Sequence, residues 1–258
     1  LLSDIYAGEN EPKRHARVFA YHLLCQHVGR DINAYGILTG VRPVKLVHKL
    51  LDAGYGSRDI KQKLEHEYCL NPKKASLLME VAENSRTYLL NREEAARNIS
   101  IYIGIPYCPT RCYYCSFPGA VLNNYEEDIP SFLKALMLEM DVIGTYLNEN
   151  KITVQSIYVG GGTPTVLSEG DIEIIFNALH KKYISGATAE ITVEAGRPDT
   201  LSPAKLKLLR EAGVTRVCIN PQTMNDSTLK LIGRNHDAKG VVQSVEWARK
   251  AGIKKINM

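Results

Sequence analysis

The fold is decided by TVQSIYVGGGTPTVLSEGDIEIIFNALHKKYISGATAEITVEA, residues 153–195. This stretch contains an apolar run at 153–161, amphipathic helical spacing at 168–183 and a second apolar run at 189–195. Short apolar runs bounded by turn-forming residues are typical of buried strands, and a helix between two such strands predicts a right-handed crossover. We therefore expect two parallel strands joined by a helix.

The same alternation continues on both sides of this stretch. Further apolar runs predict strands at 99–105, 215–220 and 253–258. Amphipathic spacing predicts further crossover helices at 127–147, 202–213 and 238–252, with a short helix before the last of them. Strands that alternate with helices at this spacing predict an α/β fold with a parallel sheet, here of five strands in an open or partial barrel.

The first part of the chain has a different pattern. Apolar residues recur at helical spacing in four segments, 17–29, 41–56, 57–68 and 72–90. No alternating strand pattern and no nucleotide-binding loop occur there. We expect a helical accessory domain at 1–97 and an α/β core at 98–258. The accessory domain could guide a substrate, bind a partner or cover the core.

The composition indicates a soluble globular protein, since 45% of the residues are apolar and 23% are charged. The net charge of +4 arises from interspersed cations and anions, without the basic stripe of a nucleic-acid-binding protein. No apolar run of roughly 18 residues predicts a membrane span, and the first residues lack the pattern of a secretory signal. Because the chain begins without Met and ends on a strand-like run, we expect a fragment with sequence missing at both ends.

Three of the six cysteines lie within eight residues, and the other three are isolated. A secreted disulfide framework would spread its cysteines over a small, loop-rich chain, so a reducing cytoplasmic location fits better. The isolated cysteines stand in apolar patterns and are expected to be buried as small hydrophobic residues: Cys25, Cys69 and Cys218.

The clustered cysteines, Cys108, Cys112 and Cys115, have the spacing CxxxCxxC. Thiolate sulfur is the usual ligand of iron–sulfur clusters, and three thiolates leave one iron of a four-iron cluster open to a small molecule. Zinc would need a fourth ligand and usually shows CxxC pairs, and no His lies nearby in the sequence. The spacing favours a cluster, with zinc or three plain thiols as the alternatives.

Unusual residues follow four of the predicted strands at the same end. The cysteines follow the first strand, GGGTPT (160–165) ends the second, Glu194 ends the third and Gln222 follows the fourth. Ligands of parallel α/β folds bind at the carboxyl ends of the strands. We therefore expect one binding site along this edge.

The cysteine spacing, with the aromatic Tyr114 directly before the third cysteine, resembles the signature of the radical S-adenosylmethionine (SAM) superfamily. The resemblance implies a partial (β/α)6 radical SAM barrel, a [4Fe–4S] cluster on Cys108, Cys112 and Cys115, and SAM as a second cofactor. In that superfamily the open iron binds the amino and carboxylate groups of SAM. An electron from the cluster then breaks the S–C5′ bond and releases a 5′-deoxyadenosyl radical.

More narrowly, IYIGIPYCPTRCYYCSF (101–117) is similar to the oxygen-independent coproporphyrinogen III dehydrogenase group, in its HemZ-type branch. Three further segments look like that branch: ILTGVRP (37–43), VEAGRPDT (193–200) and INPQTMNDSTLKLIGRNH (219–236). The resemblance covers most of residues 37–258.

The resemblance also implies the residues that contact SAM. The GGGTP loop would contact its amino group, Glu194 would contact SAM, and Gln222 and Arg234 would bind the ribose and the methionyl carboxylate. The full set adds two aromatic residues beside the cluster: Tyr102, Tyr114, Gly160, Gly161, Gly162, Thr163, Glu194, Gln222 and Arg234. Without the resemblance, the glycines would be an ordinary turn, Glu194 a surface residue, Arg234 a solvated helix end and Tyr102 a strand-packing residue.

The chain departs from the catalytic branch of this group in two places and stops before a third. Phe117 stands where that branch has a further Cys, and Gly104 stands where it has His. The Asp and the GLP turn of the next strand would lie beyond Met258.

The implied function is oxygen-independent coproporphyrinogen III dehydrogenation in haem and porphyrin biosynthesis. Two propionates would lose carbon dioxide and become vinyl groups, with a flavodoxin or ferredoxin as electron donor and a further acceptor for the remaining electron. A haem chaperone is the alternative that Phe117 favours, and a radical SAM enzyme for another substrate is a third. We expect this 258-residue chain alone to lack full turnover.

Overall fold

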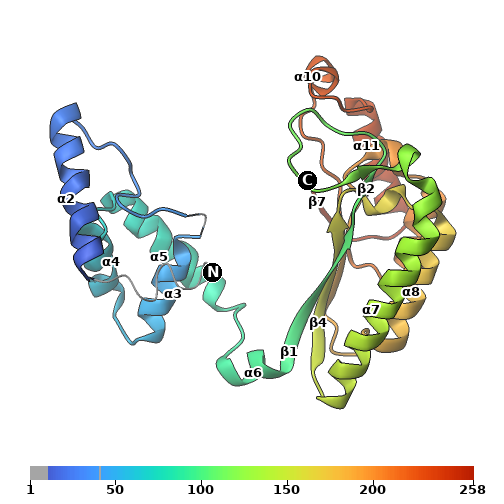
Figure 1. Cartoon of the computed structure of the whole chain (residues 1–258), viewed down its shortest axis with the longest axis horizontal. Coiled ribbons are helices and arrows are strands. Elements are labelled where there is room, and N and C mark those ends of the chain that lie inside the picture. Colours follow the sequence, from blue (N-terminus) through green and yellow to red (C-terminus); the bar gives the residue numbers. More distant parts are fainter. Residues whose placement is uncertain (1–10, 41) are drawn as a thin grey trace. The chain divides into compact units, whose positions relative to one another are not determined.

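The computed structural model describes residues 11–40 and 42–258 (Figure 1). The chain forms two compact units, Leu1–Leu90 and Asn91–Met258. The sequence suggested a boundary at residue 97, but helix α6 (Arg92–Arg97) contacts the first strand of the second unit and belongs with it.

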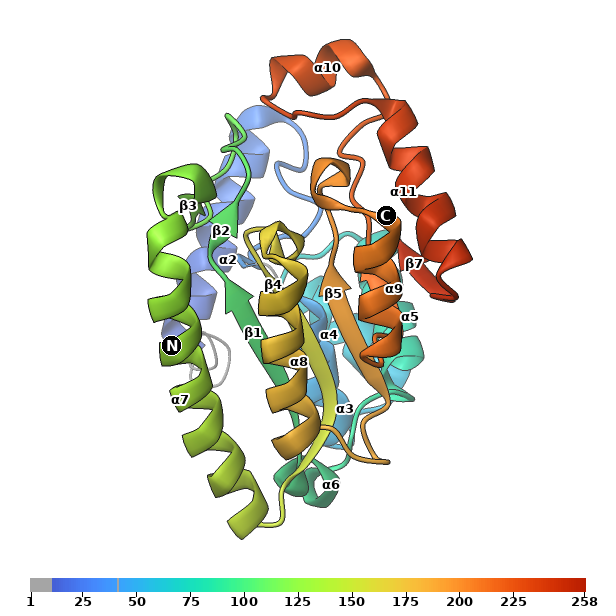
Figure 2. The same ribbon diagram turned by 90° about the vertical axis from the view of Figure 1, so that its right-hand side faces the viewer.

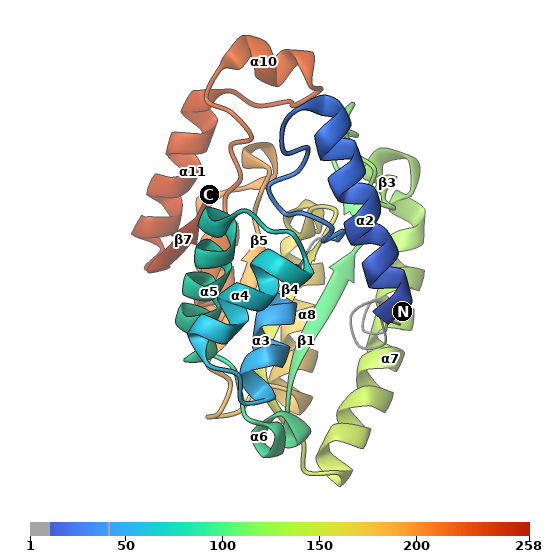
Figure 3. The ribbon, with the colours of Figure 1, turned by 90° about the vertical axis from the view of Figure 1, so that its left-hand side faces the viewer.

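The described part of the first unit is helical, as the sequence predicts. Its helices are α2 (Glu11–Val28), α3 (Val44–Asp52), α4 (Ser57–Glu67) and α5 (Pro72–Arg86). Helices α3, α4 and α5 pack around a small core that includes Val47, Ile60, Leu64 and Ala82 (Figure 3). The α2 helix keeps several apolar side chains exposed, among them Phe19 and Leu23.

The second unit contains the predicted parallel sheet. Five strands lie in the order β1-β4-β5-β6-β7, and every pair is parallel. Their bounds are β1 (Asn98–Ile105), β4 (Thr153–Gly161), β5 (Glu190–Glu194), β6 (Arg216–Cys218) and β7 (Lys255–Asn257). The five strands of this sheet follow one another across it in their chain order, which is the order of a barrel wall.

Four crossover helices cover one face of this sheet (Figure 2). They are α7 (Ile129–Glu149), α8 (Glu169–Lys182), α9 (Pro203–Glu211) and α11 (Ala238–Lys250). Because all four lie on the same side, the sheet is a partial barrel rather than a doubly wound sheet with helices on both faces. The predicted fold class is confirmed.

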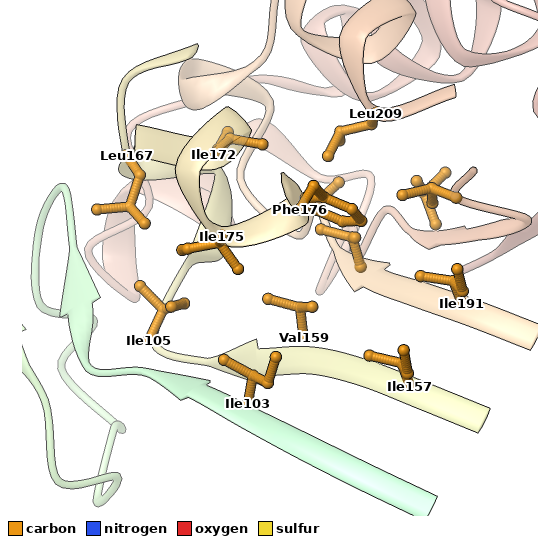
Figure 4. Close-up of a cluster of buried hydrophobic side chains, with 14 of the residues drawn as sticks. Ile103, Ile105, Ile157, Val159, Leu167, Ile172, Ile175, Phe176, Ile191 and Leu209 are labelled. Carbon is orange, nitrogen blue, oxygen red and sulfur yellow. The ribbon is translucent and has the colours of Figure 1, made fainter. Parts of the chain in front are cut away.

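The core lies between the sheet and these helices. Ile105, Ile157 and Val159 of the strands meet Ile175 and Phe176 of α8 (Figure 4). Successive strand side chains point to opposite faces, so every second residue enters this core. The intervening residues lie on the other face, where Tyr102 is 58% exposed. The first strand is therefore buried on one face only, although its apolar sequence suggested a buried strand.

A small second sheet lies at the carboxyl edge of the main one, and the sequence did not predict it. Strands β2 (Tyr107–Cys108) and β3 (Ala120–Val121) pair in parallel. They close the loop of residues 109–119, which carries two of the three clustered cysteines. A short helix, α10 (Asp226–Leu231), precedes α11.

In residues 11–40 and 42–258, no helix combines the length and the apolar character that crossing a membrane requires.

Candidate functional site

One cavity at the carboxyl edge of the sheet brings the three clustered cysteines together. It is lined by Cys108, Thr110, Arg111, Cys112, Tyr114, Cys115, Phe117, Gly119, Ala120, Val121, Gly161, Gly162, Thr163, Arg197 and Arg234. Cys112 is buried, and Cys108 and Cys115 are partly exposed. All three are free thiols.

Backbone hydrogen bonds hold the cysteine loop, residues 109–119, in shape. The Cys115 amide donates to the Cys112 carbonyl at 3.0 Å, which closes a turn between the second and third cysteines. The Tyr113 amide donates to the Ile232 carbonyl at 3.1 Å. The second bond connects the loop to the segment between α10 and α11, more than a hundred residues away in sequence.

The glycine loop, residues 160–165 at the end of β4, packs directly against Cys108. The Gly162 amide donates to the Ile105 carbonyl and the Thr163 amide to the Tyr107 carbonyl, both at 2.7 Å. The Thr163 hydroxyl donates to the Cys108 thiol at 3.4 Å. A side chain at Gly162 would place its Cβ 2.5 Å from the Tyr107 carbonyl oxygen and 3.0 Å from the Cys108 sulfur. Only glycine therefore allows this approach.

Glu194, at the end of β5, is hydrogen-bonded to the same loop. Its carboxylate accepts a hydrogen bond from the Tyr158 hydroxyl at 2.7 Å and another from the Gly161 amide at 3.1 Å. Gly161 has a φ of +110°, a conformation that favours glycine. Glu194 is half-buried and hydrogen-bonded through both oxygens, so it is not the solvated surface residue of the alternative interpretation.

Two tyrosines accompany Glu194 on the open face of the sheet. Tyr102 stacks on Tyr158 with ring centroids 5.7 Å apart and planes within 10°. Burial and the hydrogen bond to the Glu194 carboxylate raise the pKa of Tyr158 well above its usual value. Burial and the charge of Glu194 raise the pKa of Tyr102. Both hydroxyls therefore stay protonated at neutral pH.

Arg234 is buried beside Cys112 rather than solvated at a helix end. It is 9% exposed, and its Nη2 donates to the carbonyls of Gly196 and Asn220 at 3.1 and 3.2 Å. Its Nη1 lies 3.8 Å from the Cys112 sulfur. Its Nε is buried and has no hydrogen-bond partner, and no carboxylate in the described part of the chain pairs with it. A buried cation in this state attracts an anionic ligand.

A second buried cation, Arg197, also lies against Cys112, and the sequence analysis did not single it out. Its Nη1 donates to the Cys112 sulfur at 3.4 Å, and its Nη2 donates to the Thr110 hydroxyl at 2.6 Å. Its Nε donates to Asp199 at 3.2 Å. The signal that could have revealed it is the Arg-x-Asp pair of GRPDT, directly after the third strand, on the edge where the other site residues were expected.

The cavity contains most of the residues expected at the site, but not all of them. The expected residues outside its lining are Tyr102, Gly160, Glu194 and Gln222. Glu194 adjoins the cavity through Gly161, and a Cβ at Gly160 would lie 3.0 Å from the Glu194 carboxylate. Gln222 is exposed, and its φ of +62° is uncommon for a residue other than glycine.

These residues fit an iron–sulfur cluster better than a single metal ion. No three His, Cys, Asp or Glu side chains in the described residues are placed to hold one ion. In a cluster each thiolate binds its own iron, so the three sulfurs need not converge on one point. The site offers three thiols and two buried guanidinium groups, and one of these has an unpartnered nitrogen. This donor set suits a cluster with an open iron and an anionic ligand.

Comparison with known proteins gives a family match. The family model of the radical SAM superfamily matches residues 102–258. The "oxygen-independent coproporphyrinogen-III oxidase-like protein HemZ" of Bacillus subtilis is 37% identical over 238 residues, which are 92% of this chain and 47% of that protein. The haem chaperone HemW of Bacillus subtilis is 38% identical over 160 residues, 62% of this chain and 41% of that protein.

Among solved structures, coproporphyrinogen III oxidase (HemN) from Escherichia coli, a radical SAM enzyme, superposes with a TM-score of 0.57 and 26% identity. The alignment covers 64% of this chain and 38% of that one. The chain thus spans less than half the length of each of these relatives.

The close approach of Gly162 to Cys108 predicts that Gly162→Ala destabilises the second unit by about 1–3 kcal/mol, because an added methyl group must displace backbone atoms. Gly186→Ala is the matched control, since no atom lies within 4 Å of a Cβ at that position. Urea unfolding followed by the fluorescence of Trp247, the only tryptophan, measures both variants. Equal stability of the two would show that the glycine loop does not press on Cys108.

Proposed function

Because this chain belongs to the radical SAM superfamily, we propose that it binds a [4Fe–4S] cluster and SAM and acts as an oxygen-independent coproporphyrinogen III dehydrogenase. The observation that supports coproporphyrinogen III as the substrate is the 37% identity to the HemZ-like protein over 92% of the chain. That share of the chain must include much of the helical first unit as well as the radical SAM core.

The cluster would be held by Cys108, Cys112 and Cys115. These thiols line one cavity, and among the described residues its lining includes no fourth cysteine and no histidine, so one iron would stay open for SAM. When bound, cluster and SAM together supply a deoxyadenosyl radical that can abstract a hydrogen atom. The protein's own residues bind, orient and enclose the cofactors.

SAM would lie over the glycine loop, between the cysteines and the ends of β4, β5 and β6. The buried guanidinium of Arg234 suits the methionyl carboxylate, because it has no carboxylate partner of its own and a nitrogen to spare. Glu194 accepts a hydrogen bond from the Gly161 amide of the loop that would meet the SAM amino group, and Glu194 would itself contact SAM. The remaining proposed contacts are Tyr102, Tyr114, Gly160, Gly162, Thr163 and Gln222.

A haem chaperone is the second candidate. The 38% identity to HemW favours it, as does Phe117 in place of a further cysteine. The HemW match covers only 62% of this chain, whereas the HemZ-like match covers 92%. We therefore propose the dehydrogenase first, and the two functions predict different products.

Replacing any one of Cys108, Cys112 or Cys115 by Ala should abolish the cluster. Anaerobic reconstitution of the unaltered protein should give about four iron atoms per chain and the broad visible absorption of a cluster. Cys218→Ala is the matched control. Cys218 is a free thiol at the same edge and is buried like Cys112, but it donates a hydrogen bond to the Asn257 Oδ1 at 3.1 Å. Stoichiometric zinc in the unaltered protein, with iron refused, would contradict the cluster.

Glu194→Gln and Arg234→Ala should weaken SAM binding and leave the iron content unchanged. Loss of a charge-assisted contact costs about 1.5–3 kcal/mol, which is roughly a ten- to hundredfold loss of affinity. Glu190→Gln is the control for Glu194, because Glu190 lies on the same strand but pairs with Arg216 and Lys255 away from the cavity. Calorimetry of the reconstituted proteins measures the affinities, and unchanged values for both site variants would exclude these residues.

The substrate is tested by anaerobic incubation with SAM, a reductant and coproporphyrinogen III. The protein tested has the full length of the HemZ-like relative, of which this chain spans 47%. Mass spectrometry should detect 5′-deoxyadenosine, carbon dioxide and a vinyl product together. Haem binding without decarboxylation under any reductant would instead identify a haem chaperone. From that longer protein, deoxyadenosine without carbon dioxide would point to a radical SAM enzyme for another substrate.

A further inference from the structure

Arg197 is the most deeply buried charged residue in the described part of the chain, with only 2% of its surface exposed. Burying a charge is costly unless it is paired and hydrogen-bonded. One partner, Asp199, is two residues further along the chain. The other partners lie on the cysteine loop, more than eighty residues earlier. Its burial is therefore explained only by contacts that join two distant segments.

The contacts use the flat fork of the guanidinium. On one side, Nε and Nη2 donate to the two carboxylate oxygens of Asp199 at 3.2 and 3.4 Å. On the other side, Nη2 donates to the Thr110 hydroxyl at 2.6 Å and Nη1 donates to the Cys112 sulfur at 3.4 Å. A lysine could not make this set of contacts, since its ammonium lacks the planar fork.

Arg197 differs in this respect from Arg234, the other cation beside Cys112. Arg234 has no carboxylate partner in the described residues, and its Nε has no partner at all, so it has capacity left for a ligand. Arg197 is neutralised by Asp199 and all its nitrogens donate. These contacts hold the Arg197 side chain in one position, where its Nη1 donates to the Cys112 sulfur.

We propose that Arg197 is a positioning residue for the cluster. Arg197 holds Cys112 in place and, together with Asp199, sets the reduction potential of the cluster. This inference rests on the proposed function, in which Cys112 is a cluster ligand. Hydrogen bonds to ligand sulfurs and burial are established determinants of cluster potentials. An N–H donor at the Cys112 sulfur stabilises the added electron of the reduced cluster, and the Asp199 carboxylate opposes that effect. Because Arg197 is buried, water screens its charge only weakly, whereas the side chain of Asp199 is 21% exposed and its charge is screened more.

The experiment compares three variants of the reconstituted protein in an anaerobic redox titration with dithionite, followed by electron paramagnetic resonance. Arg197→Gln should shift the potential to more negative values, because the donated cation is lost. Asp199→Asn should shift it to more positive values, because the cation is no longer neutralised. Arg216→Gln is the control and should leave the potential unchanged, since Arg216 pairs with Glu190 and does not line the cavity.

Iron retention is the second measurement. In competition with a chelator, Arg197→Gln should hold its iron roughly 10- to 100-fold more weakly than the unaltered protein, as is typical for loss of an outer-shell partner. Arg216→Gln should match the unaltered protein.

Opposite shifts of the two potentials support the inference, because general damage to the fold would not give opposite signs. Shifts of the same sign, or no shift in a fully loaded Arg197→Gln protein, would overturn it. If Arg197→Gln does not fold, the positive shift of Asp199→Asn decides, and its absence overturns the inference. Failure of the unaltered protein to bind iron would instead refute the proposed function.

Discussion

The structure of the second unit depends on one apolar interface, between the parallel strands and the helices α7, α8, α9 and α11. Each strand contributes every second side chain to this interface, so its alternate residues must lie on the opposite face. Parallel strands also end at the same edge, which brings the cysteine loop, the glycine loop and Glu194 together. The burial of residues such as Ile157 and Leu179 thus positions a site that contains neither of them.

Polar contacts then fix the loops that this edge carries. Glu194 accepts hydrogen bonds from the Gly161 amide and the Tyr158 hydroxyl. The Gly162 and Thr163 amides donate to backbone carbonyls of β1 and β2. Each loop is thus held by hydrogen bonds to a neighbouring segment, in addition to the turn that the Cys115 amide closes within the cysteine loop. These hydrogen bonds are present without a ligand, and preorganisation of this kind lowers the cost of binding.

Two of the three arginines that line the cavity are buried, and these two have different roles. Arg234 leaves hydrogen-bonding capacity free, and Arg197 is saturated by Asp199, Thr110 and Cys112. Burying two cations near one thiol is costly, and such a cost is commonly met at functional sites rather than in plain cores. An anionic cluster and a carboxylate-bearing cofactor would offset it.

The sequence by itself determined the alternation of strands and helices, the helical first unit, the cysteine spacing and the family, because these depend on local periodicity and on motifs that stay contiguous. Tertiary structure alone decided the partners of each site residue. Glu194 was expected at the edge, but its bonds to Gly161 and Tyr158 join residues more than thirty positions apart. The β2–β3 pair was too short to produce a periodic signal. Arg197 was not among the expected site residues, since its burial depends on Thr110 and Cys112, which approach it only when the sheet has formed.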